Sequence, residues 1–75
     1  MVLADFKAET NVRILNLGNV TPIVKKRMND LGLIEGIEIS LYRVLPFKGP
    51  VIVDCQGQTI SFRYNDAKCI EVEAV

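Results

Sequence analysis

Histidine does not occur in this 75-residue sequence, and its absence removes both the commonest metal ligand and the commonest general base. Cysteine is scarce: Cys55 and Cys69 lie far apart and form no CxxC pair. A metal site would therefore need further soft ligands that the chain lacks. No apolar run approaches the roughly 20 residues that span a bilayer, so we expect no direct membrane insertion.

Neither sign of charge dominates, because lysine and arginine together number nine and aspartate and glutamate also number nine. A domain that binds nucleic acid usually carries a marked basic excess. No charge run exceeds Lys25-Lys26-Arg27. The composition therefore argues against nucleic acid as the partner. A small barrel that binds RNA stays as a third alternative, and salt-dependent affinity for RNA would be needed to support it.

The side chains that commonly perform catalysis form no recognisable constellation. The serines and threonines have no histidine base, and no glycine pattern resembles a phosphate-binding loop. Four acidic residues alternate with apolar ones, as on the solvated face of a strand: Glu38, Asp54, Glu71 and Glu73. We therefore expect no enzyme activity, no cofactor and no metal. On strand parity Cys55 and Cys69 point to different faces, so no disulfide is expected.

The length of 75 residues predicts a single domain, 1–75, close to the lower limit for a chain that folds without disulfides or metals. Apolar residues make up 49% of the chain, which is enough for a real core and argues against disorder. The first four residues are followed at once by Asp5, so no signal peptide is expected. We therefore expect a cytoplasmic protein with both thiols reduced.

One helix of about three turns is predicted after Thr21. Thr21 suits the N-cap and Pro22 the first helical position, where a missing N–H costs nothing. Four apolar residues fall on one helical face: Val20, Val24, Met28 and Leu31. Gly32 occupies the position after the helix where a left-handed residue is expected.

Around this helix the pattern predicts short strands, with Leu3 and Phe6 of the N-terminal segment lying on the core. The predicted strands are 11–17, 36–44, 51–56, 58–64 and 70–72, with a tight turn at Gln56-Gly57 and one helical turn at 65–67. The first strand is apolar on both faces, so a cover on both sides is expected. A flat sheet this short would leave its edges open, so we expect a small, strongly bent barrel.

Three basic residues of the predicted helix are candidates for contact with a partner. Lys25 and Lys26 lie nearer its N-terminus and Asp30 in its last turn, and both placements oppose the helix dipole. Arg27 falls at the margin of the apolar face, where its five donors could serve either of two roles. It could tether the helix by bonding backbone carbonyls or a carboxylate such as Asp54, or it could be presented to a partner.

Two aromatic residues are the apolar candidates for such a contact. Tyr42 faces outward on strand parity, and Phe47 lies in the loop between Pro46 and Pro50. Aromatic residues beside a proline-bearing loop could form a peptide-binding groove. Alternatively, Phe47 could fold back over the open end of the barrel.

Short motifs follow one another along nearly the whole chain: Leu3-Ala4-Asp5-Phe6, Arg27-Met28, Leu31-Gly32-Leu33, Gly36, Gly49-Pro50, and Ala67 with Ile70-Glu71-Val72. In this order and spacing they resemble the family of ferrous-iron transport accessory protein A (FeoA). Two positions depart from the family pattern. Glu35 stands where the family usually has proline, and Glu9-Thr10-Asn11 replaces a glycine expected before the first strand. Both departures would alter loops rather than the core.

The resemblance implies an SH3-like barrel and a small cytoplasmic protein that assists the membrane ferrous-iron transporter FeoB, which has a cytosolic GTPase domain. It leads us to expect an interaction module that docks on the cytosolic portion of FeoB through Lys25, Lys26, Arg27, Tyr42 and Phe47. Similar domains occur in iron-dependent repressors, so the alternative is a regulatory domain of metalloregulator type that senses a transition metal or a peptide. Weak self-association stays open.

Overall fold

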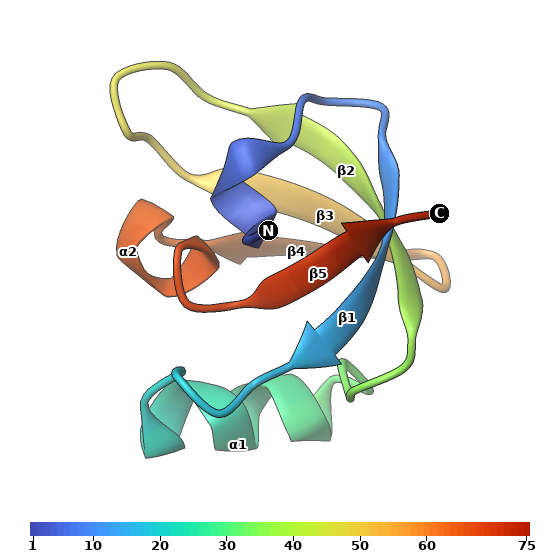
Figure 1. The fold of residues 1–75 in the computed structure, drawn as a ribbon, viewed down its shortest axis with the longest axis vertical. Coiled ribbons are helices and arrows are strands. Elements are labelled where there is room, and N and C mark those ends of the chain that lie inside the picture. The colour runs from blue at the N-terminus through green and yellow to red at the C-terminus, as the bar shows by residue number, and fades with distance from the viewer.

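A curved sheet of five antiparallel strands forms most of the structure, a computed structural model that describes residues 1–75 (Figure 1). The strands are β1 (Asn11–Asn16), β2 (Glu38–Val44), β3 (Val51–Cys55), β4 (Gln58–Phe62) and β5 (Glu71–Ala74), and their order in space is β4-β3-β2-β1-β5. The helical segments are η1 (Leu3–Asp5), α1 (Pro22–Asp30) and α2 (Tyr64–Ala67). The predicted mainly β fold, with five strands and one helix between the first two, is confirmed.

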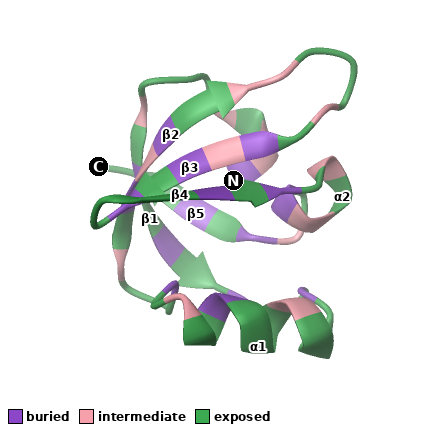
Figure 2. Ribbon diagram, turned by 180° about the vertical axis from the view of Figure 1, so that it is seen from behind, coloured by how far each residue is buried: buried purple, intermediate pink, exposed green.

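The core lies inside the bend of the sheet and contains only apolar side chains. Successive residues of a strand point to opposite faces, so buried and exposed residues alternate, as the banded strands of Figure 2 show. In β3, for example, Val51, Val53 and Cys55 are buried while Asp54 is exposed. Leu3 of η1 is fully buried and Phe6 is partly buried against the same core, as the N-terminal pattern predicted.

The prediction that β1 is covered on both faces is wrong. Its pairing with β5 shifts register between Ile14 and Asn16, which marks a bulge. The extra residue reverses the alternation, so Leu17 is buried although Ile14 is buried too, and Leu15 is left 43% exposed. The buried residues before the bulge and Leu17 after it therefore face the same core. No second layer covers the other face of β1.

Several strands are shorter than predicted because turns occupy their ends. β2 begins at Glu38 rather than 36, since the N–H of Ile37 donates to the carbonyl of Ile34 at 3.2 Å and closes a turn. β4 ends at Phe62, where the chain enters α2. The β3–β4 hairpin has the predicted two-residue turn, with φ of 51° at Gln56 and 83° at Gly57. Positive φ at both positions is the type I′ geometry that matches the strand twist.

Helix α1 begins and ends where the sequence predicts. Pro22 is its first residue, and Thr21 occupies the N-cap position, although the Thr21 side chain makes no capping hydrogen bond. At the other end Gly32 has φ of 83°. The N–H groups of Gly32 and Leu33 donate to the carbonyls of Asn29 and Met28 at 3.1 and 2.8 Å. These two bonds make a Schellman motif, which stops the helix and sends Leu33 into the core.

The two departures from the family pattern have visible structural roles. Glu9 adopts the left-handed conformation, with φ of 66°, that glycine adopts without strain. Its N–H donates to the carbonyl of Leu41 at 2.6 Å. A carboxylate oxygen of Glu35 accepts a hydrogen bond from the N–H of Leu17 at 3.0 Å. Both residues therefore tie loops to neighbouring parts of the chain.

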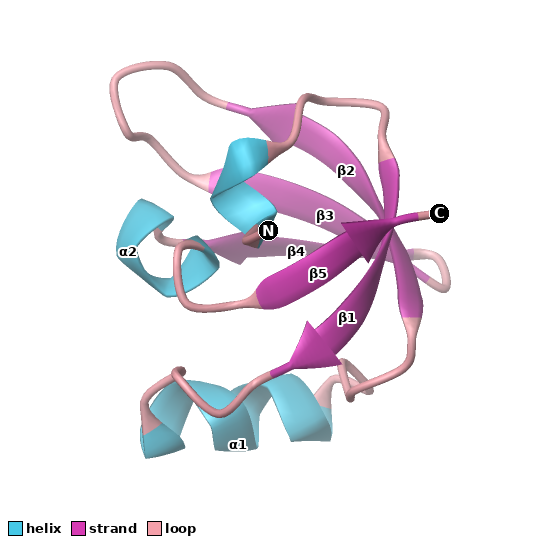
Figure 3. Ribbon diagram, viewed as in Figure 1, coloured by secondary structure: helices cyan, strands magenta, loops and turns pink.

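The two edges of the sheet are treated differently. Along β5 the N-terminal segment lies on the outer side, where the N–H of Leu3 donates to Ile70 and the carbonyl of Met1 accepts from Val72, each at 2.8 Å. β4, at the other end of the sheet, pairs with β3 alone. None of the helices is long and apolar enough to cross a membrane. β4 is therefore an edge strand with one neighbour, and the chain passes from it into α2 (Figure 3).

Candidate functional site

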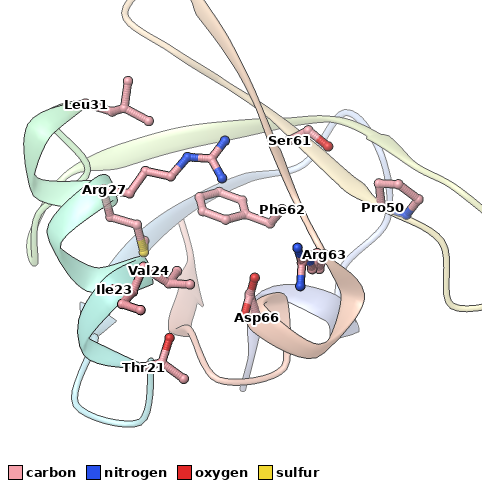
Figure 4. A pocket seen from close by; sticks show the side chains of 11 residues that line it. Thr21, Ile23, Val24, Arg27, Leu31, Pro50, Ser61, Phe62, Arg63 and Asp66 are labelled. Carbon is pink, nitrogen blue, oxygen red and sulfur yellow. The ribbon is translucent and has the colours of Figure 1, made fainter.

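A groove lies between α1 on one side and the end of β4 with the start of α2 on the other (Figure 4). Its volume is about 610 Å³. One wall comes from α1 with the residue before it, and the other from the end of β4, the start of α2 and the proline that precedes β3. The lining residues are Thr21, Ile23, Val24, Arg27, Met28, Leu31, Pro50, Ser61, Phe62, Arg63 and Asp66.

Apolar side chains form the floor of this groove. Val24, Met28 and Leu31 recur at the spacing that places them on one helical face, and Phe62 meets them from β4. Met28 and Phe62 are 1% and 6% exposed, so they belong to the core. Ile23, which precedes Val24 on the helix, is 84% exposed at the rim of the groove. A continuous apolar surface therefore runs from the core to solvent, which is typical of a site that receives a partner.

Charged side chains stand at the rim. Arg27 extends from α1 into the groove toward β4, while Arg63 and Asp66 lie on the other wall (Figure 4). The only ion pair in the structure joins Arg13 and Glu73, elsewhere on the sheet, at 3.5 Å. Both groove arginines therefore lack a carboxylate partner. The groove carries one more positive than negative charge and can bind an acidic group beside an apolar one.

A family model described as the FeoA domain matches residues 1–74 of this chain. The chain belongs to the FeoA family. The fold agrees with this assignment. The solution structure of the FeoA protein from Chlorobium tepidum superposes with a TM-score of 0.91 at 31% sequence identity, covering 100% of this chain and 70% of that one.

Two further solved structures share this SH3-like fold. Iron(II) transport protein A from Clostridium thermocellum matches with a TM-score of 0.87 at 28% identity, over 100% of this chain and 46% of that one. ScaR with bound Zn²⁺ matches with a TM-score of 0.85 at 19% identity, over 100% of this chain and 37% of that one. The second likeness shows only that the FeoA fold recurs within a longer protein.

The structure separates the residues that the sequence singled out. Lys25, Lys26 and Arg27 are all exposed on α1, but only Arg27 lines the groove of this FeoA domain. No hydrogen bond or ion pair joins Arg27 to Asp54, so the tether that the sequence left open is not formed. Arg27 is exposed, makes no ion pair and lines the groove.

Tyr42 and Phe47 lie on another part of the surface, outside the groove. Tyr42 is 60% exposed on β2, as strand parity predicts. Phe47 is 99% exposed, so it does not fold back over the barrel. It occupies the β2–β3 loop, where both Phe47 and Lys48 have φ of 59°. The aromatic pair therefore defines a second exposed surface rather than part of the groove.

Sequence reasoning missed the wall opposite α1. Pro50, Ser61, Arg63 and Asp66 were read as loop, strand and turn residues, yet the fold brings them to face Arg27. Arg63 follows the last residue of β4 and occupies the N-cap position of α2, without a capping hydrogen bond from its side chain. An arginine between a predicted strand and a predicted helical turn was the only sequence signal, and its proximity to Arg27 depends on how the sheet bends.

The cysteines are both free and differ in environment. Cys55 is buried in β3, and this burial, with the Asp54 charge beside it, raises the pKa of its thiol above the ordinary value of 9.0. Cys69 is half-buried and its thiol donates to the carbonyl of Asn65 at 3.4 Å. No three of the cysteine, aspartate and glutamate side chains gather in one place where they could hold a metal ion.

Proposed function

We propose that this FeoA-family protein assists iron(II) transport by docking, at the cytoplasmic face, on the cytosolic portion of the membrane transporter FeoB. The family assignment and the similarity to iron(II) transport protein A support the link with iron(II) transport. In this proposal the protein binds another protein and catalyses no reaction.

The observation that carries the docking proposal is the groove between α1 and β4. It combines an apolar floor with the two arginines, Arg27 and Arg63, that have no ion-pair partner. Protein interfaces are enriched in arginine and in buried apolar anchors. We therefore assign the groove as the docking surface, with Arg27 as its principal residue among those that the sequence singled out.

The other exposed candidates lie outside the groove, in two separate places that the experiment must compare with it. Lys25 and Lys26 lie on the solvent side of α1, and Tyr42 and Phe47 lie on β2 and its following loop. A solvated charge contributes little to binding, whereas an aromatic side chain as exposed as Phe47 could contribute more. The groove combines a charged contact with an apolar floor that is continuous with the core.

Binding of the purified FeoB cytosolic portion, measured by calorimetry, tests the assignment. We expect Arg27→Glu to weaken binding about tenfold or more, because it replaces an attraction by a like-charge repulsion. Arg43→Glu is the matched control, since Arg43 is exposed on β2 and lies outside the groove. Lys25→Glu/Lys26→Glu and Phe47→Ala should each change binding less than threefold.

Two results would contradict the proposal. If the unmodified protein does not bind the cytosolic portion of FeoB, the proposal of docking on FeoB is wrong. If the unmodified protein binds and Arg27→Glu binds equally well while Phe47→Ala does not, the partner uses the Tyr42–Phe47 surface instead of the groove.

A further inference from the structure

The outer edge of β4 is open, and its Ser61 end borders the groove. β4 pairs only with β3, and the pair Cys55 and Gln58 closes a two-residue turn. In such a hairpin the closing pair is hydrogen-bonded. Beyond it, non-hydrogen-bonded and hydrogen-bonded pairs alternate along the two strands. Gln58, Ile60 and Phe62 therefore bond to β3, whereas the backbone groups of Thr59 and Ser61 point away from the sheet.

No other part of the chain covers these groups. Neither Thr59 nor Ser61 takes part in any backbone hydrogen bond outside the ladders. The opposite edge of the sheet, β5, is by contrast covered by the N-terminal segment. An uncovered edge presents N–H and C=O groups that can pair with another extended chain. The protein thus protects one of its two edges and leaves the other free.

The free edge reaches the groove at the Ser61 end of β4. Ser61, Phe62 and Arg63 line the groove, and α1 stands opposite them (Figure 4). An extended chain laid beside β4 would alternate its side chains between the two faces of the sheet. On the core face each side chain would meet the floor at Phe62 and Met28. The helix would close the far side of this channel.

The charges at the rim of the groove indicate which side chains the incoming chain should carry at the positions that do not face the core. Arg27 reaches into the groove from α1, Arg63 continues the line of β4, and neither has an ion-pair partner. Asp66 is the only acidic residue of the lining. A carboxylate on the incoming chain could bond either guanidinium in a forked geometry, whereas a lysine there would meet like charge.

We propose that the groove binds an extended peptide segment of alternating apolar and acidic residues, which adds to β4 as a sixth strand. This inference deepens the docking proposal and rests on it, since it states what the docking segment of the partner looks like. β4 has five residues, so a segment of about six residues is long enough to span the edge at roughly 3.4 Å per residue.

The probe for the test is a blocked hexapeptide of alternating valine and glutamate, titrated into the ¹⁵N-labelled full chain. We expect saturable chemical-shift changes in α1 and β4, and at saturation a slowing of amide exchange at Thr59 and Ser61 of about tenfold or more. Arg27→Gln and Arg63→Gln should each weaken binding about fivefold, as for the loss of one partly exposed charge pair. Arg43→Gln should leave binding unchanged.

Two matched peptides separate strand addition from simple filling of the groove. A version with lysine in place of glutamate should bind at least tenfold more weakly, because of repulsion by Arg27 and Arg63. A version with N-methyl groups on the amides facing β4 keeps every side chain but loses the backbone donors, and we expect it not to bind. Equal binding by the N-methylated peptide, with exchange at Ser61 unchanged, would overturn the proposal.

The same exchange measurement with the FeoB cytosolic portion distinguishes the two proposals. If FeoB binds in the groove without slowing exchange at Thr59 and Ser61, docking stands and strand addition is wrong. If the hexapeptide adds to β4 and FeoB does not bind, strand addition stands and FeoB is not the partner. Protection of Ser61 that grows with protein concentration alone would assign the edge to a second copy of this chain and overturn the peptide proposal.

Discussion

The Glu35 side chain accepts a hydrogen bond from the backbone N–H of Leu17 at 3.0 Å. Leu17 precedes α1 and Glu35 follows it, so this bond closes the loop that carries the helix. Helix α1 is one wall of the groove. Glu35, one of the two positions at which this chain departs from the family pattern, therefore helps to hold the wall in place.

Replacing Glu35 by alanine should lower the free energy of unfolding by about 1 kcal/mol, since a partly exposed hydrogen bond to a charged group is lost. The urea midpoint measures this change. Glu38→Ala is the control, because Glu38 is exposed on β2 and its side chain makes no hydrogen bond. Amide exchange in α1 should also become faster in Glu35→Ala alone. Equal destabilisation by both variants would contradict this role.

Replacing Glu9 by glycine should stabilise the protein. A left-handed φ, 66° at Glu9, costs a residue with a side chain about 1–2 kcal/mol, and the greater freedom of glycine in the unfolded chain takes back about 0.5–1 kcal/mol. We expect a net gain of up to about 1.5 kcal/mol in the free energy of unfolding, measured by thermal or urea unfolding. Ala8→Gly, one residue earlier, has no such strain to relieve and should destabilise.

The Cys55 thiol predicts how stability depends on pH. Its pKa is raised in the folded state by burial and by Asp54, so above pH 9 the unfolded chain loses this proton while the folded protein keeps it. The unfolded state then binds fewer protons, and stability must fall as pH rises through this range. Cys55→Ala should be less stable at neutral pH, but its stability should fall less between pH 8 and pH 10. An equal fall in both proteins would contradict the assignment.

Titration with Fe²⁺ or Zn²⁺ tests the alternative of a metal-sensing domain. Asp54 and Cys55 are neighbours on β3, but Asp54 is exposed and Cys55 is buried, so they point to opposite faces and cannot share an ion. We expect no saturable NMR shifts at either residue up to millimolar metal. Saturable shifts centred on Asp54 or Cys55 would favour sensing over docking.

Local chemistry made much of the fold predictable from the sequence. Leu31-Gly32-Leu33 specified the end of α1 through a left-handed glycine, and Gln56-Gly57 specified the hairpin turn. The bulge at Leu15 was not predictable, because alternation alone cannot show where an extra residue enters a strand. Such features need the pairing of distant strands, which a single sequence does not reveal.

The candidate site was predictable only in part, for the same reason. Arg27 stood out by its place at the margin of a helical face, and it lines the groove. Arg63 and Asp66, at the start of α2, join Arg27 only because the sheet bends and carries β4 toward α1. Likewise, the free edge at Ser61 follows from the strand order, which places β4 last in the sheet.

The most direct test of the account is a map of the amide shifts that the FeoB cytosolic portion causes in the ¹⁵N-labelled protein. The account predicts that the largest changes fall in α1, at residues 61–66 and near Pro50, which together surround the groove. It also predicts small changes around Tyr42 and Phe47. Changes centred on Tyr42 and Phe47, with Arg27 and Arg63 unaffected, would contradict it.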